Sequence, residues 1–118
     1  MNFYNEIKEE LINNEIYKRA KDYSKNRSDL NTYYNVGKIL YEAGKHYGEG
    51  IIKEYSKRLT AEIGKGYTYT SLTRIRKFYN IIEKLATMSQ LLSYGHYVEL
   101  LSIQNLNEIK YYIHIVEK

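Results

Sequence analysis

The chain has 118 residues, of which 15 are Tyr and none is Cys, Pro or Trp, and it carries a formal net charge of +4. A domain of this size buries a core without disulfide or metal support, and the absence of Cys excludes a disulfide framework and a thiolate metal site. No apolar run approaches the roughly 20 residues of a membrane span, and residues 1–10 lack the pattern of a secretory signal. We therefore expect one domain over residues 1–118, located in the cytoplasm and not associated with a membrane.

The first predicted element is a helix from Phe3 to Tyr23. Apolar residues recur along it at intervals of three and four, in a stripe that is broad and drifts. The polar sequence at residues 26–29 predicts a turn after this helix. Either Ser28 or Asp29 would then be the N-cap of the second helix.

The second helix has one continuous face, and two of the residues on that face are glycines. The face consists of Tyr33, Gly37, Leu40, Gly44 and Tyr47. We expect Gly37 and Gly44 to let another backbone come close, at a cost of about 1 kcal/mol each in helix propensity relative to Ala. Residues 47–50 are expected to end the helix.

The third and fourth helices are predicted on either side of a glycine turn. The third runs from about Ile51 to Ile63 and ends at the glycines of residues 64–66. Thr68 is the expected N-cap of the fourth helix, over residues 69–85. The inward residues of the third helix are expected to be Ile52, Tyr55, Leu59 and Ile63.

The remaining elements are a loop over residues 86–90 and two short helices. Ser93 or Tyr94 opens a helix that runs through Leu101, and Asn105 caps a last helix over residues 106–116. Residues 111–116 could also form a strand, but the spacing of apolar residues favours a helix. The predicted fold class is therefore all-α: a compact bundle of about five to six helices with a helix-turn-helix unit.

Almost all of the excess positive charge lies in residues 53–77. This stretch has seven cations and two anions, a net charge of +5, whereas the rest of the chain has a net charge of −1. A basic patch on a helix-turn-helix shape is typical of a nucleic-acid contact. The turn at residues 64–68 is nevertheless longer than the three or four residues of a tight helix-turn-helix motif.

Helical spacing divides the fourth helix into an apolar side and a polar side. Residues suited to contact bases and phosphates fall on the polar side, opposite Leu72. Arg76 lies on the edge of the apolar side, so we predict a structural role in which its guanidinium reaches a carboxylate or helix-end carbonyls. The candidate nucleic-acid-binding residues are Lys53, Lys57, Arg58, Lys65, Thr70, Thr73, Arg74 and Lys77.

No catalytic or metal-binding pattern is evident. The three His residues are far apart, and none has a partner at metal-ligand spacing. Glu108 and Lys110 match the E-x-K half of a nuclease site, but no upstream Asp on a neighbouring strand accompanies them. We expect no enzymatic activity, no metal and no cofactor.

Several short motifs occur in a fixed order between about residue 15 and residue 116. The most specific are Ile63-Gly64-Lys65-Gly66-Tyr67-Thr68, Ile75-Arg76-Lys77-Phe78-Tyr79 and Leu92-Ser93-Tyr94-Gly95-His96-Tyr97. This order resembles the YhcG-type N-terminal domain, although Ser71, Ile75 and Tyr94 replace the family's Asn, Met and Trp. The resemblance implies a helical, winged-helix-like DNA-binding domain, of the kind that precedes a PD-(D/E)xK nuclease domain in restriction- or mobile-element-associated proteins. We expect no such nuclease domain within residues 1–118, which would be either a piece cut from a longer protein or a free-standing domain.

Three functions follow as hypotheses. The first is a non-catalytic module that binds double-stranded DNA and targets a nuclease. The second is a free-standing phage or mobile-element protein that inhibits a defence complex, in the manner of an anti-CRISPR protein, through protein or guide-RNA contacts. The third is a homodimerisation module in which the glycine-bearing second helix or the tyrosine-rich first helix forms the interface.

Overall fold

The computed structural model describes residues 2–20, 25–85, 88, 92–101 and 105–117, with only the backbone for residues 17–20, 25–28, 116 and 117. Six helices make up this part of the chain, and it contains no strand, so no β wing is present there. The all-α prediction is confirmed. The helices are α1 (Phe3–Ala20), α2 (Lys25–Tyr47), α3 (Gly50–Glu62), α4 (Tyr69–Leu85), α5 (Tyr94–Leu100) and α6 (Leu106–Glu117).

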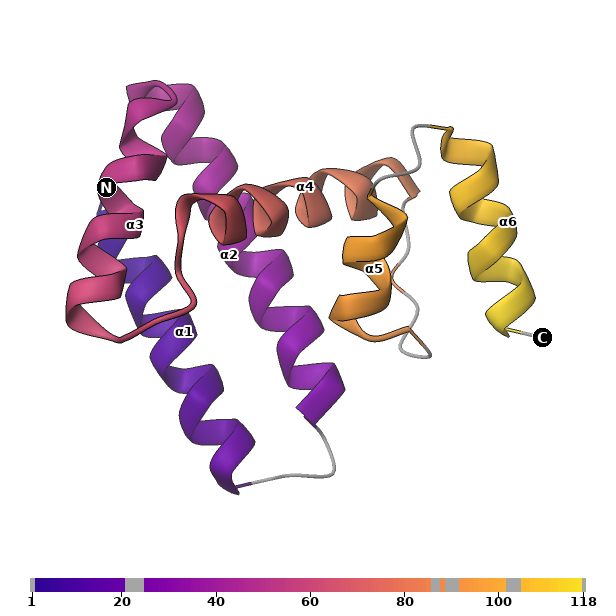
Figure 1. Cartoon of the computed structure of the whole chain (residues 1–118), viewed down its shortest axis with the longest axis horizontal. Coiled ribbons are helices and arrows are strands. Elements are labelled where there is room, and N and C mark those ends of the chain that lie inside the picture. Colours follow the sequence, from indigo (N-terminus) through magenta and orange to yellow (C-terminus); the bar gives the residue numbers. More distant parts are fainter. Residues whose placement is uncertain (1, 21–24, 86–87, 89–91, 102–104, 118) are drawn as a thin grey trace.

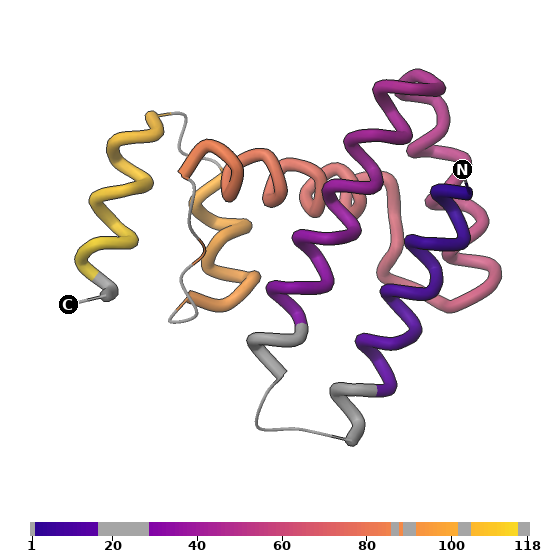
Figure 2. The backbone as a smooth tube through the Cα atoms, turned by 180° about the vertical axis from the view of Figure 1, so that it is seen from behind, coloured from indigo at the N-terminus to yellow at the C-terminus, as the bar shows by residue number. Residues whose placement is uncertain are grey.

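Helix α2 is the longest and lies at the centre of the fold (Figure 1). It packs against α1, α3, α4 and α5, and α4 crosses it. The reverse view shows that α6 lies beside α5, at the end of the molecule farthest from α1 and α3 (Figure 2). None of the helices in the described ranges is long and apolar enough to cross a membrane.

Two clusters of buried side chains form the core. One lies among α1, α2, α3 and the start of α4, and the other lies among the start of α2, the end of α4, α5 and α6. Tyr33 and Tyr94 pack against both clusters, and their ring centroids are 4.3 Å apart. Helix α4 contributes Leu72 to the first cluster and Phe78 to the second, so its position is fixed along its length.

The crossing of α2 and α4 depends on Gly37. A Cβ atom at this position would lie 2.5 Å from the backbone oxygen of Ile75 and 2.6 Å from the Cβ of Tyr79. The predicted close backbone approach is therefore confirmed for Gly37. The same prediction is wrong for Gly44. The nearest atom to a Cβ placed at Gly44 belongs to a side chain, Nη1 of Arg76, at 3.2 Å.

The start of α2 differs from the sequence prediction. The expected turn at residues 26–29 is helical, because α2 has already begun at Lys25, and the prediction of Ser28 or Asp29 as its N-cap is therefore wrong. The side-chain amide of Asn14 in α1 donates a hydrogen bond to the Asp29 carboxylate, 3.1 Å long. Polar residues that favour a turn in isolation are helical here because α1 supplies a partner.

The boundaries around α3 and α4 follow the prediction closely. Gly64 and Gly66 end α3 with positive φ values of 147° and 105°, which only glycine adopts readily. The Thr68 hydroxyl accepts a hydrogen bond from the Ser71 amide, 3.1 Å long, and so caps α4. At the other end of α3, Tyr47 is 56 % exposed, so the predicted packing face of α2 ends before this residue.

The C-terminal helices begin at the predicted caps. The side chain of Ser93 accepts from the His96 amide, and the His96 ring in turn accepts from the Ser93 amide. Asn105 accepts from the Asn107 amide at 2.9 Å and caps α6. Residues 111–116 are helical, as favoured, and most of the predicted loop at residues 86–90 lies outside the described residues.

Candidate nucleic-acid interface

Tyr67 anchors the turn that joins α3 to α4. Its backbone oxygen accepts a hydrogen bond from the Ser56 hydroxyl in α3, 2.7 Å long. Its own hydroxyl donates to Glu15 in α1, 2.6 Å away, and burial together with this carboxylate raises the pKa of Tyr67. The turn that precedes α4 is therefore attached to both α3 and α1.

Arg76 has the structural role that its helical position predicted. Its guanidinium donates two hydrogen bonds to Glu49, 2.6 and 2.8 Å long, and the Tyr69 hydroxyl donates to the same carboxylate at 2.8 Å. The pKa of Glu49 is lowered to about 2, mainly by the hydrogen bond from Arg76. The same hydrogen bond raises the pKa of Arg76. This cation is already neutralised within the chain.

Arg58 faces α1 and not α4. Its guanidinium stacks on the ring of Tyr4, with Cζ 3.7 Å from the ring centroid. Tyr4 also donates a hydrogen bond to Glu62, which Lys8 approaches to 3.2 Å. Burial, and to a smaller extent the hydrogen bond with Glu62, raises the pKa of Tyr4 to about 12. The structure therefore separates Arg58 from the other candidate cations, although its side chain remains exposed.

Lys53 and Lys57 lie on the other side of α3. At 100° per residue they are about 40° apart around the helix, and about 140° from the side that carries Arg58 and Glu62. Both lysines are exposed, and the ammonium of Lys53 lies 5.4 Å from the ring centroid of Tyr69, in the first turn of α4. Lys53 thus adjoins the start of α4.

The polar side of α4 presents three of the four predicted residues to solvent. Thr70, Arg74 and Lys77 are exposed, and neither cation has a carboxylate within ion-pair distance among the residues that the structure describes. Thr73 differs, since it is half-buried and its hydroxyl is covered. A Thr hydroxyl stands close to its own helix backbone, so an outward helical position does not guarantee that it is exposed.

Carboxylates near α4 are turned away from this polar side. Glu83 accepts a hydrogen bond from Tyr34 of α2, and this contact is the main cause that raises the pKa of Tyr34 to about 12. Glu49 and Glu62 are occupied by the contacts described above. We use the name basic face for six exposed residues that the sequence predicted as nucleic-acid contacts on α3, the turn and α4: Lys53, Lys57, Lys65, Thr70, Arg74 and Lys77. Glu54, an exposed carboxylate of α3, is not part of it.

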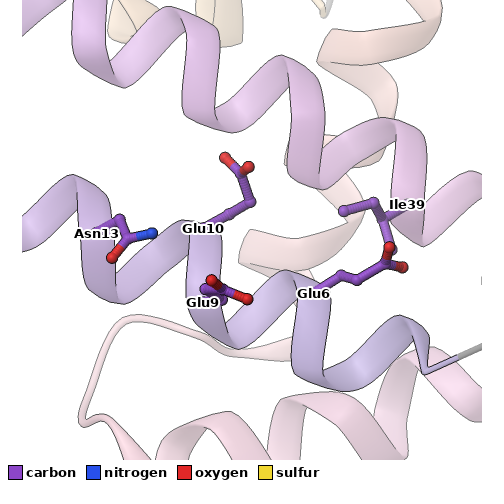
Figure 3. Close-up of a pocket in the computed structure, with 5 residues that line it drawn as sticks. All are labelled: Glu6, Glu9, Glu10, Asn13 and Ile39. Carbon is purple, nitrogen blue, oxygen red and sulfur yellow. The ribbon is translucent and has the colours of Figure 1, made fainter.

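An acidic groove lies elsewhere, between α1 and α2 (Figure 3). Glu6, Glu9, Glu10 and Asn13 of α1 line it together with Ile39 of α2, around a volume of about 280 Å³. Three carboxylates in one groove repel a polyanion. The groove and the exposed cations of α3 and α4 therefore lie on different helices.

The described residues include no group of three side chains that could hold a metal ion. Glu108 and Lys110, the half-match to a nuclease site, are exposed on α6, which is a helix and not a strand. Of the three histidines, His96 caps α5 and His46 packs against the ring of Phe3.

One cation on the polar side of α4 was missed by sequence reasoning. Lys84 is exposed and lies seven residues after Lys77, which places it on the same stripe of the helix. The seven-residue spacing was visible in the sequence, but Lys84 lies outside the charged stretch of residues 53–77. The structure also shows that Gly37, on the glycine face of α2, is covered by α4 of the same chain, so a second copy cannot dock there.

Comparison with known protein families identifies the family of this chain. The family model described as DUF1016 N-terminal domain, which is the YhcG N-terminal family, matches residues 5–118. The resemblance to the YhcG-type N-terminal domain is thereby confirmed. No curated protein and no solved structure matches the chain.

Proposed function

We propose that this chain, which belongs to the DUF1016 N-terminal domain family, is a non-catalytic module that binds double-stranded DNA. It would act as the targeting part of a restriction- or mobile-element-associated nuclease system. The observation that carries the proposal is the basic face, where five exposed cations on α3, the turn and α4 lie without an internal ion-pair partner among the described residues.

The separation of the paired from the unpaired cations supports this function. A stability network would be expected to place its cations against carboxylates, as Arg76 is placed against Glu49. The cations of the basic face instead point to solvent, where their mutual repulsion has no structural benefit. Neutralisation of phosphates and release of the counterions around them would offset this repulsion.

The two helices would have different tasks. Lys53 and Lys57 of α3 would contact the phosphate backbone and set the position of the domain. Helix α4 would lie in the major groove, where Arg74 can donate two hydrogen bonds to a guanine and Thr70 can contact a phosphate or a base edge. Tyr67 would hold the two helices in the relative orientation that this docking needs.

Substitution of Arg74 tests this function most simply. Arg74→Glu should abolish binding to a fluorescent DNA duplex, measured by anisotropy, because it places a negative charge in the middle of the basic face. The thermal midpoint should change little, since Arg74 is exposed. Unchanged duplex binding by the variant would overturn the proposal, as would a wild-type protein that captures a defence protein but shifts no duplex.

A further inference from the structure

We infer that α4 docks lengthwise along the nucleic acid, so that Lys84 in its last turn is a phosphate contact as well. This inference rests on the proposed function and makes it more specific. An end-on docking, in which only the first turn of α4 enters the groove, is the alternative that the experiment below separates from it.

The polar residues of α4 form a nearly straight stripe along the helix. Thr70, Lys77 and Lys84 follow one another at intervals of seven residues, and an α-helix drifts by only about 20° over seven residues. All three side chains are exposed. At 1.5 Å per residue the stripe extends over about 21 Å, which is nearly the full length of α4.

The charged residues along this stripe are all cations. Beside it lie Arg74, Asn80 and two half-buried residues, Thr73 and Ile81, but no carboxylate. The only acidic residue of α4, Glu83, lies about 100° away around the helix from Lys84, and Tyr34 of α2 donates a hydrogen bond to it. A polyanion that lay along the stripe would therefore meet cations in the second, third and last turns without passing a negative charge.

The first turn of α4 is poorly suited to end-on docking. The Ser71 amide, one of the free donors with which a helix start attracts phosphate, already donates to the Thr68 hydroxyl. The carboxylate of Glu49 also lies beside this turn, because the Tyr69 hydroxyl donates to it. Glu49 therefore already occupies the hydroxyl donor that Tyr69 would offer to a phosphate at the helix start.

The two dockings differ in what they predict for Lys84. A major groove is about 8.5 Å deep, so a helix that enters it end-on leaves a residue about 21 Å from its first turn outside the groove. Lys84 then makes no contact. In a lengthwise docking Lys77 and Lys84 both reach phosphates, and each contributes to the salt dependence of binding.

The experiment compares Lys84→Gln with Lys77→Gln and with a control, Lys38→Gln, which removes the same charge from an exposed position on α2. Duplex affinity is measured from 50 to 300 mM salt, and thermal midpoints verify that each variant is folded. Both α4 variants should reduce the slope of log affinity against log salt by about 0.9, which corresponds to about an eightfold loss of affinity at 0.1 M salt. The control should leave the slope unchanged.

Two outcomes would overturn the inference in distinguishable ways. If wild-type protein binds the duplex with a steep salt dependence and Lys84→Gln binds equally well, the lengthwise docking is wrong while the proposed function stands. If wild-type protein shows no salt-dependent binding to the duplex, the proposed function itself fails, and the inference fails with it.

Discussion

Glu49 and Arg76 are joined by two hydrogen bonds, 2.6 and 2.8 Å long, although 27 positions separate them in the sequence. Glu49 lies in the short turn between α2 and α3, whereas Arg76 lies in the middle of α4. The pair therefore attaches α4 to the opposite end of α3 from the glycine turn. It also removes from the basic face a cation that a count of charges would assign to it.

The first prediction concerns pH. Because Arg76 donates to the ionised carboxylate, the pKa of Glu49 is about 2 in the folded protein, compared with an ordinary value of 4.5. A pKa that folding lowers contributes stability above about pH 4.5, and this stability is lost as the pH falls toward 2. Glu49→Gln should lower the free energy of unfolding at pH 7 by about 1 kcal/mol or less, since the carboxylate is half-exposed and screened by solvent.

Urea denaturation at pH 7, 4.5, 3 and 2 provides the measurement. The difference between wild type and Glu49→Gln should shrink through this series and vanish near pH 2. Other carboxylates titrate in both proteins, so the difference between them isolates Glu49. A difference that stayed constant down to pH 2 would show that the ionised pair with Arg76 does not stabilise the fold.

The second prediction concerns the helix crossing. Gly37→Ala would place a methyl group 2.5 Å from the backbone oxygen of Ile75, so α2 and α4 must move apart. Overpacking of this kind costs about 1–3 kcal/mol, of which about 1 kcal/mol is offset by the better helix propensity of Ala. We expect a net loss of up to about 2 kcal/mol in the free energy of unfolding, measured by urea denaturation.

Gly50→Ala is the matched control for this substitution. Gly50 is the first residue of α3, and nothing lies within 4 Å of a Cβ atom placed there. The same chemical change should therefore be neutral or slightly stabilising. Equal effects of the two substitutions would mean that the close approach at Gly37 is not a determinant of stability.

The third prediction concerns the anchor of the turn. Tyr67→Phe keeps the ring but removes the hydrogen bond to Glu15, which should cost about 0.5–1.5 kcal/mol of stability. Amide hydrogen exchange at residues 64–68 should become faster by more than the change in global stability explains. Exchange rates that rise only in proportion to global stability would show that Tyr67 does not hold the turn locally.

The fourth prediction separates two arginines that are neighbours in sequence. Arg76→Gln should lower the thermal midpoint, because it breaks the pair with Glu49, and should leave the salt slope of DNA binding nearly unchanged. Arg74→Gln should leave the thermal midpoint nearly unchanged and should make the salt slope of DNA binding shallower, since Arg74 is exposed and has no described ion-pair partner. The same two readouts, thermal midpoint and salt slope, are measured for both variants. A reversed pattern would mean that their structural assignment is wrong.

Local signals explain which parts of the fold were predictable from sequence. The ends of α3 and α4 follow from Gly64, Gly66 and Thr68, whose effects act on their immediate neighbours in the chain. The start of α2 was not predictable in this way, because the partner of Asp29 is Asn14 in another helix. Contacts between distant parts of the chain override a local preference for a turn.

The same distinction applies to the candidate interface. Helical spacing alone identified Arg76 as a structural residue, since its position on the edge of the apolar side is a local property. The position of Arg58 against Tyr4 depends on how α1 packs on α3, and no pattern within α3 indicates it. Lys84 lies outside the charged stretch of residues 53–77, and only its seven-residue spacing from Lys77 indicates that it belongs to the polar stripe.

The salt dependence of duplex binding by the wild-type protein tests the central claim most directly. If the five cations of the basic face neutralise phosphate charge, log affinity should fall against log salt with a slope near −4 to −5, and Lys84 would make the slope steeper by about 0.9. Fluorescence anisotropy with a 20-base-pair duplex between 50 and 300 mM salt gives this slope. A flat response, or no binding at 50 mM salt, would contradict the account.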